Sequence, residues 1–160
     1  MTEPTPRHRP DRHKSLVGFT VGDVHYAIAI DRVREIVNPL EITSLPYTPP
    51  EIAGVADHRG EVVPVIDLRV RFNLPPKSEE RGTKWILVAL GDRIVGLIVD
   101  AVTEVFGPRN EDIRPTPEVG GNRDMRGISG VAKHDGKLIF VLDTQRFLEL
   151  VDALSATGAI

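Results

Sequence analysis

"GVADHRGEVVPVID", residues 54–67, recurs later in the chain as "GVAKHDGKLIFVLD", residues 130–143. Both stretches begin with Gly-Val-Ala, carry a histidine two residues before a glycine, and end on an aspartate after an apolar run. The matched positions include Gly54, Val55, Ala56, His58, Gly60 and Asp67 in the first stretch, and Gly130, Val131, Ala132, His134, Gly136 and Asp143 in the second. Such self-similarity is typical of an internal repeat.

A second pair of matching stretches precedes the first pair in the chain. "VGDVHYAIAIDRVREIV", residues 21–37, matches "LGDRIVGLIVDAVTEVF", residues 90–106. The identical pairs are Gly22 with Gly91, Asp23 with Asp92, Asp31 with Asp100, Val33 with Val102, and Glu35 with Glu104. Because the two matching stretches occur in the same order in both halves of the chain, the sequence contains two copies of one structural unit.

Each copy of the unit is predicted to form β-sheet. Short β-branched segments bounded by Gly, Asp or Pro are typical of strands, and those segments are residues 24–30, 61–66, 84–90, 93–99 and 137–142. Gly22-Asp23 and Gly91-Asp92 suit two-residue hairpin turns, and Gly60 and Gly136 mark a second hairpin in each copy. Small antiparallel sheets avoid exposed edge strands by closing into barrels. Two packed β-barrels around a shared core are therefore expected.

The chain divides into predicted parts along its length. The opening residues 1–15 are polar and proline-rich, which predicts a disordered tail. The predicted domain, residues 16–150, contains a first barrel at 16–72, a polar connector at 73–82 and a second barrel at 83–143. The predicted flexible end covers residues 154–160.

Helices are expected to be few. Asp31 and Asp100 are predicted to cap short helical turns, which Pro39 and Pro108 end. A closing helix is predicted over residues 144–153, because Phe147, Leu148 and Val151 share one helical face. An irregular excursion, residues 108–127, occurs only in the second copy.

Composition excludes several classes of protein. The chain has 160 residues, 41% of them hydrophobic, and no cysteine, which removes disulfides and thiolate chemistry. A net charge of -3 argues against nucleic acid as a partner. The apolar runs fall far short of the ~20 residues of a membrane helix, so no membrane insertion and a cytoplasmic location are expected.

The triplet Asp57, His58 and Arg59 raises the question of catalysis. Neighbouring strand residues point to opposite faces, so three in succession are not expected to converge on one reacting atom. The second copy has Lys133 and Asp135 where the first has Asp57 and Arg59, so the hairpin persists while its charges change. The triplet is therefore predicted to be the end of a hairpin rather than a catalytic site.

A metal-dependent alternative stays open from the residues alone. It is a small hydrolase or metal-binding protein that uses His58, His134 and nearby aspartates. No spacing in the sequence completes a set of three or four ligands. The favoured interpretation is two solvated histidines, with no metal and no cofactor.

Three stretches together resemble the CheW family of chemotaxis coupling proteins. They are "GVADHRGEVVPVIDLRVRFNL" from Gly54, "VGLIVDAVTEVFGPRNEDIRPTP" from Val95 and "GVAKHDGKLIFVLDTQRFLEL" from Gly130. The resemblance spans Leu16 to Leu150. It implies a mainly β fold of two packed SH3-like five-stranded β-barrels, with short helices and a C-terminal helix.

The resemblance also implies a function. Family members are non-enzymatic scaffolds that couple the cytoplasmic tip of a chemoreceptor to a CheA-type histidine kinase, which carries a CheW-like regulatory domain of its own. The resemblance therefore implies a cytoplasmic adaptor recruited to receptor arrays. An alternative within the family is a protein that binds only receptor or only kinase and acts as a competitor.

Some functional positions follow from the resemblance residue by residue. The arginine of the family's Asn-Leu-Arg-Gly hairpin is matched by Arg59, which implies a receptor contact; Glu35 and Ile36 are matched to the segment beside the same groove. The implied kinase-binding surface is apolar, and its candidate residues are Val17, Ile30 and Val33. This chain departs from the family by having Asp57-His58 in place of Asn-Leu.

Overall fold

The computed structural model describes residues 15–78, 81–108, 113–115 and 127–156. The predicted disordered tail therefore lies outside the described residues except for Ser15, which is buried. Most of the predicted excursion and the last four residues of the predicted flexible end also lie outside them. The described part is mainly β, in two sheets with few helices, which confirms the predicted fold class.

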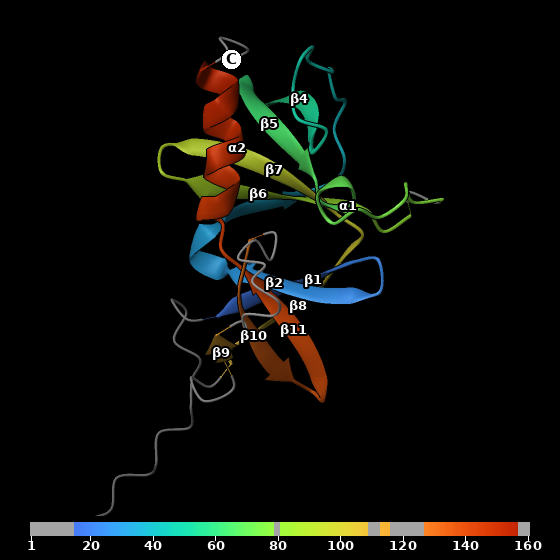
Figure 1. Cartoon of the computed structure of the whole chain (residues 1–160), viewed down its shortest axis with the longest axis vertical. Helices are drawn as coiled ribbons and strands as arrows, with labels where there is room; N and C mark the ends of the chain where they lie inside the picture. The colour runs from blue at the N-terminus through green and yellow to red at the C-terminus, as the bar shows by residue number, and fades with distance from the viewer. Residues whose placement is uncertain (1–14, 79–80, 109–112, 116–126, 157–160) are drawn as a thin grey trace, which may run out of the picture.

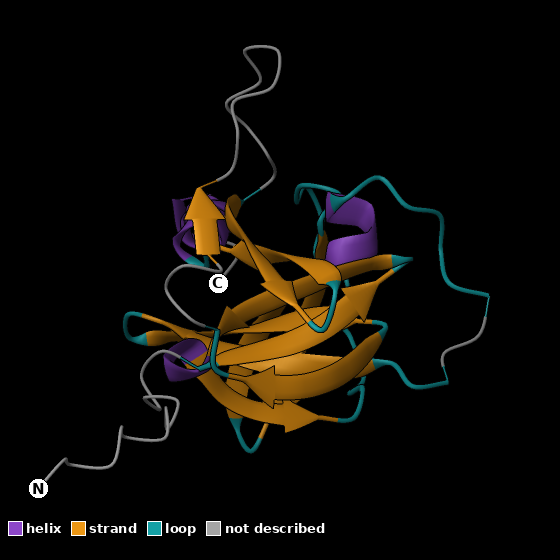
Figure 2. Ribbon diagram, turned by 90° about the horizontal axis from the view of Figure 1, so that it is seen from below, coloured by secondary structure: helices purple, strands orange, loops and turns teal. Residues whose placement is uncertain are grey.

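Both sheets contain strands from both halves of the chain. The six-stranded sheet has the order β8-β1-β2-β11-β10-β9, with β1 Leu16–Val21, β2 Val24–Ala29, β8 Ala101–Phe106, β9 Ile113–Pro115, β10 Ile128–His134 and β11 Lys137–Leu142. The five-stranded sheet has the order β3-β6-β7-β5-β4, with β3 Val33–Val37, β4 Ile52–His58, β5 Glu61–Asp67, β6 Lys84–Leu90 and β7 Arg93–Val99. Figure 1 shows the two sheets as separate layers, and Figure 2 shows their strands stacked.

The first hairpin of each copy is exchanged between the two sheets. β1 and β2 pair with β8 and β11 of the second copy, whereas β6 and β7 pair with β3 and β5 of the first. The predicted barrel bounds, 16–72 and 83–143, therefore do not coincide with the sheets. The chain crosses between sheets right after each first hairpin: a three-residue 3-10 turn, Ile30–Arg32, separates β2 from β3, and Asp100 alone separates β7 from β8.

The predicted hairpin turns are confirmed. Gly22 and Gly91 have φ of +62° and +66° in the two-residue turns of β1–β2 and β6–β7. The turn after β4 has positive φ at Arg59 (+52°) and Gly60 (+84°), and the turn after β10 repeats this at residues 135 and 136. Positive φ at both central residues defines a type I′ turn, whose twist matches that of the flanking strands.

The helical turns predicted after Asp31 and Asp100 are wrong. Beyond the 3-10 turn, the chain continues as β3 in the first copy, and in the second it continues directly as β8. Along β3, Val33, Glu35 and Val37 are half-buried while the two residues between them are exposed, which is the period of a strand. Pairing with β6 and β1 gives β3 and β8 backbone partners that a short isolated helix would lack.

The α-helices found among the described residues are α1, Leu68–Arg71, and α2, Gln145–Ala156. The closing helix is thus confirmed, and it extends three residues past the predicted end, Ala153. Phe147 and Val151 are fully buried in the core, and Leu148 packs against it. No helix in the described ranges is long and apolar enough to cross a membrane.

A shared core joins the two sheets, as predicted. It contains Val17, Phe19 and Ile28 from one sheet, Ile86 and Leu97 from the other, and the buried face of α2. Each sheet also has a smaller apolar cluster of its own, built around Trp85 in the five-stranded sheet and around Phe106 in the six-stranded sheet.

Arg69 of α1 clamps the point where the chain passes from β7 to β8. Its guanidinium donates two hydrogen bonds to the Asp100 carboxylate, at 2.9 and 2.7 Å, and the same carboxylate accepts from the backbone N–H of Gly22 at 2.8 Å. Burial alone would raise the pKa of Asp100, but these hydrogen bonds and the charges of Arg69 and Lys77 together lower it below its usual value. The clamp ties the β1–β2 turn to the other half of the chain.

Candidate interaction sites at the two barrel seams

The five-stranded sheet closes on itself through side chains at its two edge strands, β3 and β4. His58 Nε2 lies 3.0 Å from Glu35 Oε2, and Arg59 Nη2 donates to Glu35 Oε1 at 3.0 Å. We call Glu35, His58 and Arg59 the first seam. Two of the three triplet residues thus meet at one carboxylate, each at a different oxygen, and Arg59 reaches it from the turn with positive φ.

The third triplet residue, Asp57, supports the turn itself. Its Oδ1 accepts a hydrogen bond from the backbone N–H of Gly60 at 2.8 Å. An aspartate that bonds to the backbone a few residues on is a common way to stabilise a turn. The hairpin therefore keeps its form with Asp57 in place of the family's asparagine, and the side chain of Arg59 stays 76% exposed.

The predicted receptor-binding residues are only partly brought together. Glu35 and Arg59 form the ion pair of the first seam, and the Glu35 side chain is 32% exposed. Ile36 is 41% exposed and is one of several exposed large apolar residues in the described part of the chain. Because neighbouring residues of a strand face opposite sides, Ile36 points away from the ion pair.

The predicted kinase-binding residues are mostly covered. Val17 is 2% exposed and belongs to the shared core, so its prediction as a surface contact is wrong. Ile30 and Val33 are half-buried and pack against the same core. These two residues stay predictions, with only part of each side chain accessible.

Sequence reasoning missed further exposed apolar residues, and three of them are more than half exposed aliphatic side chains at positions related by the repeat. Val62 is 60% exposed, Val105 57% and Leu138 61%. In the repeat, Val105 is the counterpart of Ile36, and Leu138 is the counterpart of Val62. The repeat was therefore the signal that could have found them, because both copies carry an apolar residue at each of these outward-facing positions.

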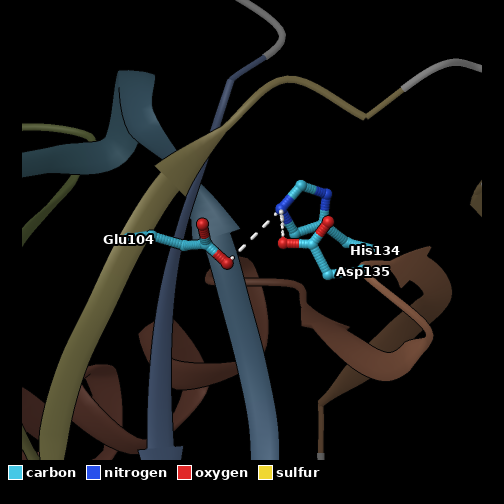
Figure 3. Close-up of side chains that lie close together, drawn as sticks. All are labelled: Glu104, His134 and Asp135. Carbon is cyan, nitrogen blue, oxygen red and sulfur yellow. Dashed lines mark ion pairs between the residues drawn. The ribbon is translucent and has the colours of Figure 1, made fainter.

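The six-stranded sheet has an equivalent seam between β8 and β10. His134 Nε2 lies 3.3 Å from Glu104 Oε1 and 3.6 Å from Asp135 Oδ2. We call Glu104, His134 and Asp135 the second seam, and Figure 3 shows the three side chains pointing toward one another. The imidazole also stacks on the Phe106 ring, with the ring centroids 4.2 Å apart.

The structure does not assemble the metal site that combines His58 with His134. His58 is paired with Glu35 in one sheet, and His134 with Glu104 in the other. Within the described ranges, the one group of at least three close metal-ligating side chains is the second seam. The hypothesis of a hydrolase built on both histidines therefore has no site in the described part of the chain.

Comparison with known proteins gives consistent matches. The CheW-like domain family matches residues 15–152. The chemotaxis protein CheW of Helicobacter pylori is 34% identical over 135 residues, which cover 84% of this chain and 81% of that protein. The CheW of Klebsiella aerogenes is 35% identical over 130 residues, covering 81% of this chain and 78% of its own.

A solved structure matches as well. The crystal structure of the scaffolding protein TtCheW from Thermoanaerobacter tengcongensis superimposes with a TM-score of 0.75 at 35% identity, covering 81% of this chain and 88% of that one. The chain therefore belongs to the CheW family, and the resemblance drawn from its motifs is confirmed. These matches support an adaptor role in chemotaxis rather than an enzymatic one.

Proposed function

We propose that the protein couples a chemoreceptor to a CheA-type histidine kinase, as an adaptor without catalytic activity of its own. The observation that carries this proposal is the first seam, where Arg59 stands 76% exposed on a rigid turn beside Glu35. An exposed arginine on a preformed turn is suited to bidentate contact with a partner's carboxylate. The seam lies on a chain of the CheW family.

The receptor side of the proposal rests on how the first seam is built. Glu35 holds one Nη atom of Arg59 at 3.0 Å, which limits the positions that the long side chain samples. Less conformational entropy is then lost when a partner binds. Ile36 offers apolar surface on the next residue of the same strand, and helices that dock on such surfaces bury apolar residues there.

The kinase side rests on the apolar residues that the repeat leaves exposed. Ile30 and Val33 are accessible in part, whereas Val62, Val105 and Leu138 are mostly exposed. Exposed apolar residues at equivalent places in both copies suit contact with another CheW-like domain, such as the regulatory domain of the kinase. This contact, together with the receptor contact, is what would recruit the protein to receptor arrays.

The receptor contact is tested by reversing the charge of Arg59. We expect Arg59→Glu to weaken binding of a receptor cytoplasmic fragment by at least about 2 kcal/mol, the scale of an interface hot spot. Isothermal titration calorimetry measures the affinity, and a thermal melt confirms folding. Lys137→Glu, an equal reversal at an exposed position of β11, is the control. Normal receptor binding by a folded R59E protein would remove Arg59 from the interface.

The coupling itself needs both partners in one experiment. We expect the protein to bind the CheW-like regulatory domain of the kinase near one to one, and to form a three-component complex when receptor fragment is added. Size-exclusion chromatography of the mixture detects that complex. Displacement of one partner by the other would contradict coupling and favour a competitor that binds a single partner at a time.

A further inference from the structure

The second seam gathers three metal-ligating side chains. Glu104, His134 and Asp135 each offer one ligand atom, and these atoms lie within 4.8 Å of one another (Figure 3). The donor set is one imidazole nitrogen with two carboxylate oxygens. Zn²⁺ and its neighbours in the first transition row accept such a mixed set, whereas Mg²⁺ and Ca²⁺ prefer oxygen ligands alone.

The distances within the seam fit a small tetrahedral ion. Ligand atoms about 2.0–2.2 Å from such an ion lie about 3.3–3.6 Å from each other. His134 Nε2 is 3.3 Å from Glu104 Oε1 and 3.6 Å from Asp135 Oδ2, so two edges of the ligand triangle already have that length. The two carboxylate side chains are 48% and 75% exposed, so they are free to close the third edge by rotation.

The imidazole is held in place before any ion binds. Its ring lies nearly parallel to the Phe106 ring, with 17° between the planes, and Phe106 itself is buried. Asp135 occupies the first central position of the type I′ turn, with φ of +49°. A ligand on a packed ring and another on a two-residue turn lose little freedom on binding.

The first seam shows what the second one lacks. There, the position that corresponds to Asp135 is Arg59, and its guanidinium supplies a positive charge to Glu35 at 3.0 Å. In the second seam a carboxylate takes that position, and His134 is the partner that the described residues give to both carboxylates. The second seam therefore holds two carboxylates and no guanidinium.

We propose that the second seam binds a divalent transition-metal ion of the Zn²⁺ class through Glu104, His134 and Asp135. The ion takes the place that the Arg59 charge holds in the first seam. Three protein ligands leave at least one coordination position for water or for a side chain of a binding partner. Because Glu104 lies on β8, an edge strand, and His134 on β10, the strand next to the other edge, the ion also links the two ends of the sheet.

The test is calorimetric titration of the full chain, purified without a histidine tag, with zinc chloride. We expect one ion per chain, and at least tenfold weaker binding in both Glu104→Gln and His134→Ala. Glu104→Gln preserves the size of the side chain, which keeps the test valid if removal of the His134 ring disturbs its packing on Phe106. Circular dichroism confirms that each variant is folded.

Two control variants separate this site from three of the other four histidines. His58→Ala removes the imidazole of the first seam, and a variant with both His8 and His13 changed to alanine removes those of the N-terminal segment. Both are expected to bind zinc as the parent protein does. The proposal is overturned if zinc does not bind at up to about 1 mM, or if the affinity falls only in the two controls and not in the seam variants.

Discussion

The two seams have the same construction but differ in charge. In each, a glutamate on an edge strand, β3 or β8, pairs with a histidine at the end of another strand, β4 or β10, at 3.0 Å in the first and 3.3 Å in the second. The residue after the histidine is Arg59 in the first seam and Asp135 in the second. The duplicated scaffold therefore keeps its geometry, while one turn residue decides whether the seam glutamate lies beside an arginine or beside a second carboxylate.

The interiors of the two sheets differ in a compensating way. Val37 on β3 is paired with Trp85 on β6, and at the equivalent place Phe106 on β8 is paired with Leu16 on β1. The five-stranded sheet thus has its large ring, Trp85, on the inner strand β6, and the six-stranded sheet has Phe106 on the edge strand β8. Only the second arrangement puts an aromatic ring beside the seam histidine, where Phe106 stacks on His134.

The largest predicted effect follows from exchanging these interiors. Trp85→Leu removes a side chain that is 1% exposed, and we expect a loss of about 3 kcal/mol in the free energy of unfolding. Val37→Phe alone is expected to lose about 1–2 kcal/mol through overpacking. In the double variant the new ring fills the space that the indole left, so the total loss is at least about 1 kcal/mol smaller than the sum.

Urea unfolding of the parent, both single variants and the double variant measures this cycle. Unchanged denaturant slopes would show that all four proteins unfold from comparable native states. If the two losses simply add, the positions do not compensate, and the equivalence of the two interiors is wrong.

The next effect concerns the clamp at the crossing from β7 to β8. The Asp100 carboxylate accepts three hydrogen bonds, whereas the carboxamide of Asp100→Asn has one acceptor oxygen and a donor NH2 group. We therefore expect this variant to lose about 2 kcal/mol in the free energy of unfolding. Asp92→Asn, the same change at an exposed turn residue, is expected to stay within about 0.5 kcal/mol. Equal losses in the two variants would show that the clamp does not stabilise the fold.

The same carboxylate predicts a dependence on pH. The pKa of Asp100 is lower in the folded protein than its ordinary value, so its contribution is complete above the unfolded pKa of about 3.9. It is lost as the pH falls through the lower folded pKa. We therefore expect the difference in stability between parent and D100N proteins to narrow below about pH 4 in urea titrations. A difference that is constant from neutral to acid pH would contradict the role of this charge.

Much of the local structure could be predicted from the sequence. Glycines in the hairpin turns and apolar segments of strand length placed β2, β5, β6, β7 and β11 correctly, because both signals are local, whereas β3 and β8 were predicted as helical turns. The exchange of hairpins could not be predicted, since β1–β2 and β6–β7 are copies of one pattern, and either could pair with either set of remaining strands. The choice depends on the short crossings at Ile30–Arg32 and Asp100, which force the chain into the other sheet.

The candidate site was predictable only in part for a similar reason. Arg59 and Glu35 were both selected through the family resemblance, and the structure places Arg59 Nη2 3.0 Å from Glu35 Oε1. The sequence of either strand alone does not indicate this contact. Val17 was misplaced because an apolar strand residue carries no signal of which side faces the core. The second seam was missed because Glu104 on β8 is far along the chain from the adjacent residues His134 and Asp135.

The smallest predicted effect separates the two seams by their turn residues. Type I′ turns favour Asn-Gly, and an arginine with φ of +52° is a poor choice for that conformation. Arg59→Asn also removes an ion pair with Glu35, but exposed pairs contribute little. We therefore expect R59N to raise the free energy of unfolding by about 0.5 kcal/mol, and Asp135→Asn to leave it nearly unchanged because aspartate already tolerates positive φ.

Urea unfolding measures both variants, and titration with the receptor fragment measures the binding of R59N. If R59N is more stable but binds the receptor fragment more weakly, then Arg59 lowers the stability of the turn and contributes to binding. That combination is expected of an interface residue and not of a structural one. A less stable R59N protein would show instead that the Glu35–Arg59 pair holds the first seam together, and the contrast with Asp135 would then be one of structure rather than of partner recognition.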